Sequence, residues 1–138
     1  MPAGCARVSG ASYPAILTAR SWTYPLYHKH TYILPGIPGL LKQGGVLVSL
    51  IKPQFEAGRG AVGKGGIVKS PRDRLFAVQR VLDCARVAGF GCLGLMTSPI
   101  TGGDGNVEYL VALRLGEETF PEREQVEKII TGGLPWKK

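Results

Sequence analysis

The chain has 138 residues, a formal net charge of +7, 20 glycines and 10 prolines. That length supports one domain with one core, and the glycine and proline content predicts that loops take up much of the chain. The longest apolar run, Val46 to Ile51, is far shorter than the roughly 20 residues of a membrane span. We therefore expect no membrane partner.

The positive charge lies in the first half of the chain. Residues 1–69 contain eight Lys or Arg and one acid, Glu56, which gives +7, whereas residues 70–138 contain nine of each and are neutral. A basic half suits a phosphate-rich partner such as RNA. From charge alone, a soluble basic surface is an equally good interpretation.

The cysteines, Cys5, Cys84 and Cys92, are odd in number and form no Cys-X-X-Cys pair. Cys84 and Cys92 fall in elements expected to be buried, where a free cysteine acts as a small apolar residue. This favours a reducing compartment, and we expect a cytoplasmic protein. No metal site is predicted, because His28 and His30 have no Cys or carboxylate cluster near them and an exposed polar turn is favoured.

The first predicted elements lie between residues 34 and 69. A short helix is indicated by apolar residues at helical spacing, namely Leu34, Ile37, Leu40 and Leu41. Val46 to Ile51 is β-branched and apolar without alternation, which is typical of a strand buried on both faces, as in a parallel sheet. Residues 53–69 are predicted to be a glycine-rich loop.

A longer helix is predicted after Ser70, the expected N-cap, with Pro71 at its first position and Asp73 in its first turn. Gly89 is expected to end it. Its apolar face comprises Leu75, Val78, Leu82 and Ala85. Three further elements complete the prediction: strands at 91–97 and 107–115 and a terminal helix at 122–130.

The order of elements predicts an α/β fold. A strand–helix–strand unit implies a parallel pair joined by a right-handed crossover. The connection 98–106 is too short for another crossover, so the last two strands should be antiparallel. Lys52 ends the first strand and Glu108 begins the strand of opposite direction. Both should therefore lie at the carboxyl edge of the sheet, where open α/β folds bind ligands.

Two glycine patterns in the loop are unconvincing. Residues 58–63 match GxGxxG, but five residues separate them from the preceding strand, whereas a dinucleotide fingerprint follows its strand directly. Residues 58–64 match GxxxxGK, but Gly65 stands where a P-loop needs Ser or Thr. Nucleotide hydrolysis is therefore disfavoured.

The strings LIKPQFEAGR at residues 50–59 and GKGGIV at 63–68 are more specific. Together with TSPITG at 97–102 and GNVEYL at 105–110, they closely resemble the hemolysin A (TlyA) family of FtsJ-like ribosomal RNA 2′-O-methyltransferases. The resemblance runs from about Leu34 to Arg114. It implies a Rossmann-like methyltransferase sheet, S-adenosylmethionine as cofactor and ribosomal RNA as partner.

The resemblance also implies site residues. Such enzymes use a Lys-Asp-Lys-Glu tetrad, in which Lys52 matches the second lysine and Glu108 the glutamate. In the family's sheet the last strand lies between its two predecessors, so these side chains should meet. A neutral lysine can take a proton from a ribose hydroxyl, and an ammonium can stabilise the alkoxide. Without the resemblance, a solvated strand end would be the usual interpretation of either residue.

Three cations of the glycine-rich loop, Arg59, Lys64 and Lys69, are candidates for RNA phosphate contacts, because exposed glycine backbone also offers N–H donors. A basic loop without a ligand is nearly as good an interpretation. A non-catalytic RNA-binding or scaffold remnant therefore remains the alternative function. A membrane-active hemolysin is disfavoured, since the chain has no long apolar or strongly amphipathic basic segment.

The chain departs from the family in its first part. The family's S4-type domain, cofactor loop, first lysine and aspartate are not found, so the cofactor-binding residues are unknown. We expect a divergent segment at 1–32, a partial FtsJ-like domain at 33–115, and a C-terminal helix and tail at 116–138. The hypothesis is a truncated chain that holds the C-terminal half of the catalytic domain, with its N-terminal strands missing. Strand 46–51 would then offer an unpaired edge for self-association.

Overall fold

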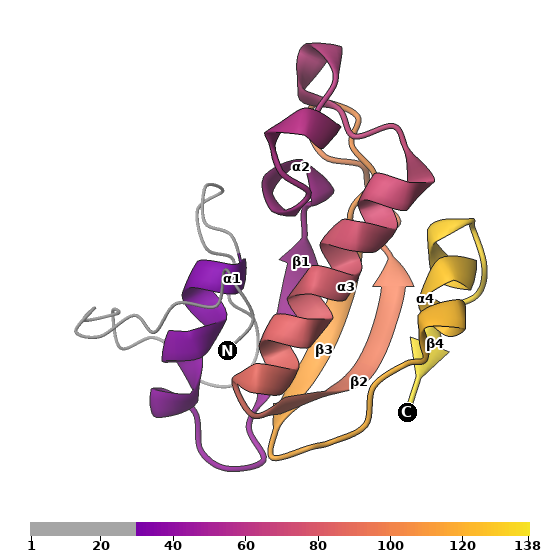
Figure 1. The fold of residues 1–138 in the computed structure, drawn as a ribbon. Helices are drawn as coiled ribbons and strands as arrows, with labels where there is room; N and C mark the ends of the chain where they lie inside the picture. Colours follow the sequence, from indigo (N-terminus) through magenta and orange to yellow (C-terminus); the bar gives the residue numbers. More distant parts are fainter. Residues whose placement is uncertain (1–29) are drawn as a thin grey trace.

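Four strands form the sheet of the computed structural model, which describes residues 30–138 (Figure 1). Their order across the sheet is β1-β3-β2-β4. β3 is antiparallel to both β1 and β2, and β4 is antiparallel to β2. β1 and β2 therefore run in the same direction without pairing. The strands are β1 (Val46–Ile51), β2 (Phe90–Thr97), β3 (Tyr109–Leu115) and β4 (Trp136–Lys137).

The sheet confirms most of the predicted topology. The first three strands lie where the sequence placed them, and β3 is antiparallel and inserted between β1 and β2. β1 and β2 run parallel, as predicted, but they do not pair with each other, because β3 separates them and every pairing within residues 30–138 is antiparallel. β4 was not predicted.

The main helix, α3 (Pro71–Val87), connects β1 to β2 and packs across the sheet. Pro71 stands at its start, where a missing N–H costs nothing. Gly89, with φ of 93°, supplies the left-handed residue that ends it. Ser70 occupies the N-cap position, but its side chain makes no capping hydrogen bond, so that part of the prediction is wrong.

The other helical elements are short. They are α1 (His30–Ile33), the 3₁₀ turns η1 (Leu34–Gly39), η2 (Arg59–Ala61) and η3 (Lys64–Gly66), α2 (Pro53–Glu56), and α4 (Arg123–Ile130). The segment 53–69, predicted as a glycine-rich loop, thus contains three short helical turns, α2, η2 and η3. Of the apolar face predicted here, Leu34 and Ile37 are buried and Leu41 packs against the core, whereas Leu40 is exposed. No helix among residues 30–138 is both long and apolar enough to cross a bilayer.

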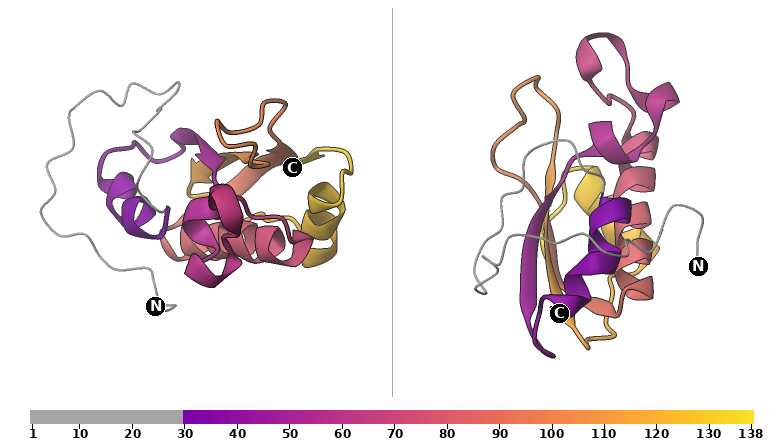
Figure 2. Two further views of the ribbon diagram at one scale, coloured as in Figure 1. Left: turned by 90° about the horizontal axis from the view of Figure 1, so that it is seen from above. Right: turned by 90° about the vertical axis from the view of Figure 1, so that its left-hand side faces the viewer.

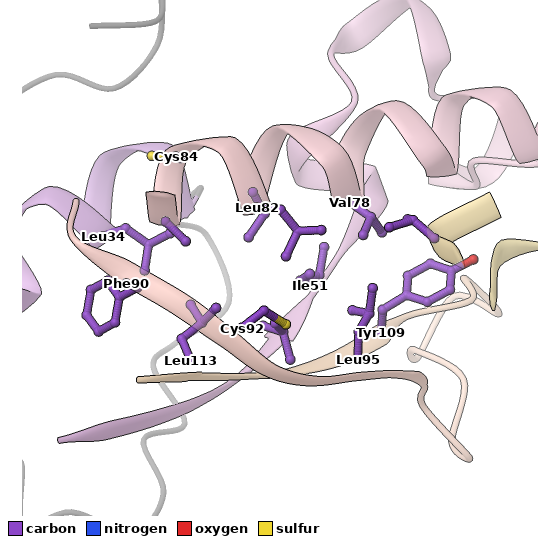
Figure 3. Packing of buried hydrophobic residues seen from close by; sticks show 14 of the residues in the cluster. Leu34, Ile51, Val78, Leu82, Cys84, Phe90, Cys92, Leu95, Tyr109 and Leu113 are labelled. Atoms are coloured by element: carbon purple, nitrogen blue, oxygen red, sulfur yellow. The ribbon is translucent and has the colours of Figure 1, made fainter. Parts of the chain in front are cut away.

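The core lies between α3 and one face of the sheet (Figure 3). In the side view of Figure 2, α1, α3 and α4 all lie on the same side of the strands. Val48 on the opposite face of β1 is 43% exposed. The prediction of a strand buried on both faces is therefore wrong: a run of apolar residues does not reveal whether a second layer of helices covers the sheet.

Both described cysteines are buried, as predicted. Burial raises the pKa of Cys92 to about 11, and a hydrogen bond with the Gly94 backbone offsets this rise only in part. Because the thiolate is the reactive form, we expect Cys84 and Cys92 to resist an aromatic disulfide reagent at pH 8. The measurement uses a Cys5→Ser variant with and without urea. Fast modification of either thiol without denaturant would contradict the buried placement.

Candidate active site

Lys52 follows β1 directly and stands at the point where the chain turns into α2. Its backbone is extended, with φ of −109° and ψ of 100°, and Pro53 begins the helix. A residue before proline is restricted to such extended conformations. The Lys52 side chain is 22% exposed, and its Nζ lies 5.8 Å from the centre of the Phe55 ring. Its amine is therefore fixed near the sheet edge yet open to solvent.

Glu108 lies opposite Lys52 at the end of the neighbouring strand. In the antiparallel register Ile51 pairs with Tyr109, so Lys52 and Glu108 form the next facing pair. Facing residues in such a ladder have Cβ atoms about 5 Å apart. The Lys52 Nζ lies 3.8 Å from Glu108 Oε1, and the Glu108 side chain is only 5% exposed. The structure thus brings the two predicted site residues together.

Gln54 is a third side chain at this position, and the sequence analysis missed it. Its Nε2 donates a hydrogen bond of 3.2 Å to Glu108 Oε1. Its own Oε1 is buried and has no hydrogen-bond partner among residues 30–138. The sequence signal that could have pointed to Gln54 was its position two residues after Lys52 in the KPQF string. Gln54 and Lys52 therefore hold the same carboxylate oxygen from two sides.

Gly102 allows the loop before β3 to pass close to this carboxylate. A Cβ at Gly102 would clash with Glu108 Oε1, whereas a Cβ at Gly103 would meet no atom within 4 Å. The Gly102 N–H donates to the Asn106 carbonyl oxygen and its carbonyl accepts from Gly105 N–H, which closes a tight turn. Only glycine at 102 leaves Glu108 in its place.

We expect Gly102→Ala to displace the Glu108 carboxylate and to lower any turnover that uses it by about tenfold or more, because small misplacements of reacting groups are costly. The matched control is Gly103→Ala in the same turn. Initial rates of both variants, with urea unfolding curves beside them, separate a site effect from a folding effect. Equal rates for the two variants would show that the position of Glu108 is unimportant.

The candidate RNA contacts, Arg59, Lys64 and Lys69, are all exposed. They lie in η2, in η3 and just before α3, beyond the end of the sheet that carries Lys52. Asn106, which is 1% exposed, anchors this segment from the other side. Its Oδ1 accepts from the Val68 N–H and its Nδ2 donates to the Gly66 carbonyl, both at 2.9 Å. The basic segment is thus tied to the loop that leads to Glu108.

His30 occupies a different environment from the exposed polar turn predicted for it. Its side chain is 13% exposed and lies between Glu56 and Ser49. Glu56 Oε1 accepts from the His30 N–H at 2.6 Å and lies 2.9 Å from Nδ1, while Nε2 lies 2.6 Å from Ser49 Oγ. These contacts fasten α1 to β1 and α2. His28 lies outside the described residues.

Comparison with known proteins identifies the family. Residues 18–115 match the FtsJ-like methyltransferase family. The chain belongs to this family. The resemblance found in the KPQFEAGR and GKGG strings is confirmed. The match begins inside the segment expected to be divergent, and the domain boundary at residue 32 stays a prediction.

Related FtsJ-like proteins are substantially longer than this chain. It is 48% identical over 97 residues to YqxC of Bacillus subtilis, which is provisionally named an rRNA methyltransferase. This alignment covers 67% of this chain and 34% of YqxC. It is 42% identical over 82 residues to the 16S/23S rRNA (cytidine-2′-O)-methyltransferase TlyA of Mycobacterium tuberculosis, covering 59% of this chain and 31% of TlyA. The chain thus spans about a third of the length of these curated relatives.

A solved structure supports the same assignment. A Lactococcus lactis protein, provisionally called a hemolysin, superposes with a TM-score of 0.69 at 38% sequence identity. The superposition covers 79% of this chain and 52% of that chain. The α/β fold of this chain is therefore shared with about half of that protein.

The cofactor of FtsJ-like methyltransferases does not fit the described residues. A cofactor of this size binds where a strand leads through a glycine-rich turn into a long helix. Here β1 leads into the four-residue α2, and β2 leads into the loop 98–106 that returns as β3. Within residues 30–138, neither strand end supplies such a cradle. The pair Lys52–Glu108 therefore does not lie beside such a cradle among residues 30–138.

Proposed function

We propose that this chain carries the acceptor-activating residues of an S-adenosylmethionine-dependent RNA 2′-O-methyltransferase. The observation that supports this most directly is the pair Lys52–Glu108, with 3.8 Å between Nζ and Oε1, at the edge of a sheet in an FtsJ-like family member. In this function Lys52 and Glu108 are the catalytic residues. They would act on the ribose hydroxyl of the RNA.

The chemistry of the acceptor follows from these two groups. A ribose hydroxyl becomes nucleophilic only when its proton is removed or its developing negative charge is stabilised. A neutral Lys52 amine would accept the proton, and an ammonium would instead stabilise the oxygen. Glu108 orients the Lys52 amine and is itself held by Gln54. In this function the methyl group would come from S-adenosylmethionine.

The proposed partner is ribosomal RNA. The name of TlyA states that it methylates cytidine ribose in 16S and 23S rRNA. Arg59, Lys64 and Lys69 are exposed near the acceptor site, and such side chains position nucleic acid through its phosphates. We place this activity in the cytoplasm, where ribosomal RNA is available.

We further propose that the sheet corresponds to the C-terminal part of a Rossmann-like methyltransferase sheet. β1 is the terminal strand of the sheet within residues 30–138, and its free edge would pair with further strands or with another copy of the chain. The likeness to longer relatives, of which this chain spans about a third, supports this assignment.

A second candidate function is RNA binding without catalysis. The absence of a cofactor cradle among residues 30–138 favours it, because the basic segment and the acceptor site do not depend on that cradle. The two functions differ in one testable respect: only the enzyme would transfer the methyl group of S-adenosylmethionine to RNA.

Incubation of the full chain with ribosomal RNA and methyl-labelled S-adenosylmethionine tests the proposal. We expect label to enter the RNA at a rate that depends on chain concentration. Retention of RNA on a filter without incorporation of label would reject the enzyme and support the binding function. Absence of both would reject the two functions together.

A further inference from the structure

Phe76 is an aromatic side chain on the outer face of α3, and it is 54% exposed. The buried residues of the same helix, among them Val78 and Leu82, face the sheet. Keeping a phenyl ring in water is unfavourable in proportion to its exposed apolar area. No motif or site described above accounts for its exposure.

Two arginines flank Phe76 on the same stripe of the helix. Arg72 precedes it by four residues and Arg80 follows it by four. Residues at this spacing lie on one face, about 6 Å apart along the axis. Within residues 30–138 neither arginine forms an ion pair, unlike Arg86 further along α3, which lies 4.0 Å from Asp83. The stripe is therefore an aromatic ring between two unpaired cations.

The stripe continues the basic segment at the start of α3. Figures 1 and 2 show residues 57–69 beyond the N-terminal end of this helix, and α2 packs against it. Residues 57–82 contain one acid, Asp73, and six cations, which gives +5. The cations are Arg59, Lys64, Lys69, Arg72, Arg74 and Arg80. Such a surface is complementary to a polyanion.

We propose that the stripe Arg72–Phe76–Arg80 is a binding site for single-stranded RNA. The Phe76 ring stacks on an unpaired base, and the two arginines contact the flanking phosphates. Aromatic rings between cations are the usual means of holding single strands, because every base has a stackable face. An apolar protein partner would instead require a continuous apolar patch, and the neighbours of Phe76 on this stripe are charged. The inference rests on the RNA partner proposed above and assigns it a second contact surface.

The experiment measures the affinity of the full chain for a fluorescent unpaired oligoribonucleotide by anisotropy. We expect Phe76→Ala to weaken binding about tenfold and Phe76→Trp to preserve it, since stacking on an aromatic ring is the lost interaction. Val87→Ala, a second exposed apolar residue of α3, is the matched control and should bind like the wild type. Arg72→Gln and Arg80→Gln should each lower the salt dependence of binding, by roughly 0.7 in the slope of log K against log salt, whereas Phe76→Ala should not.

Three outcomes would overturn the inference. Phe76→Ala could bind as tightly as the wild type, the wild type could bind no RNA, or Phe76→Ala could abolish self-association in sedimentation without changing RNA affinity. The last result would make the stripe a contact between copies. The proposed function fails separately: RNA binding that depends on Phe76 but occurs without methyl transfer would reject the enzyme and keep this site.

Discussion

Replacing Lys52 by methionine is expected to lower the rate of methyl transfer to ribosomal RNA about a hundredfold or more, with RNA affinity little changed. Methionine keeps an unbranched apolar side chain but removes the amine, whose Nζ lies 5.8 Å from the centre of the Phe55 ring and 3.8 Å from Glu108 Oε1. A positioned acid or base typically contributes 10²–10⁴ in rate. Single-turnover rates at saturating RNA measure the chemical step apart from binding.

The control for this variant is Lys42→Met. Lys42 is an exposed lysine in the turn before β1 and lies outside the acceptor site. The Lys42→Met variant should transfer methyl groups at the wild-type rate. A Lys52→Met variant that keeps more than about a tenth of the wild-type rate would exclude Lys52 as the group that activates the acceptor. The methyl-transfer rate of Glu108→Gln should lie between those of Lys42→Met and Lys52→Met, because this variant removes the charge that orients Lys52 and keeps the size of the side chain.

Replacing Asn106 by alanine is expected to lower the free energy of unfolding by about 2–4 kcal/mol, since each buried group left without its partner costs about 1–3 kcal/mol. The variant would lose two hydrogen bonds of 2.9 Å and leave the buried Val68 N–H without an acceptor. Urea unfolding followed by circular dichroism gives this change when the slope with denaturant is unaltered.

Asp104→Ala is the control for Asn106, because Asp104 is an exposed residue of the same turn. It should change stability by less than about 0.5 kcal/mol. If Asn106→Ala were equally mild, the two loops would not be joined through this side chain. Weakened RNA binding by a folded Asn106→Ala protein would show that the anchor also presents the basic segment to its ligand.

Much of the fold could be predicted because the signals were local. The apolar run of β1, the proline and glycine that bound α3, and the short connection before β3 each act within a few residues. The facing of Lys52 and Glu108 followed from two further facts, the strand directions and the strand order implied by the family resemblance. The site pair was therefore predictable, although neither residue alone carries a distinctive signal.

The remaining features depend on contacts between distant residues. β4 has only two residues and exists because Trp136 pairs with Leu95 on β2. His30 is held by Glu56, which lies 26 residues away, and by Ser49. Gln54 and Gly102 matter only because Glu108 lies between them. No local period or turn pattern reports such contacts, so the sequence predicted neither the contacts of His30 nor the groups that hold the carboxylate.

The most direct test of the central claim is the identity of the modified nucleoside. Ribosomal RNA incubated with the full chain and S-adenosylmethionine is digested to nucleosides, which are analysed by mass spectrometry. We predict a 2′-O-methylated nucleoside that is absent when Lys52→Met replaces the wild type. A base-methylated product, or the same ribose product with Lys52→Met at the wild-type level, would contradict the assignment of Lys52 and Glu108 to the ribose hydroxyl.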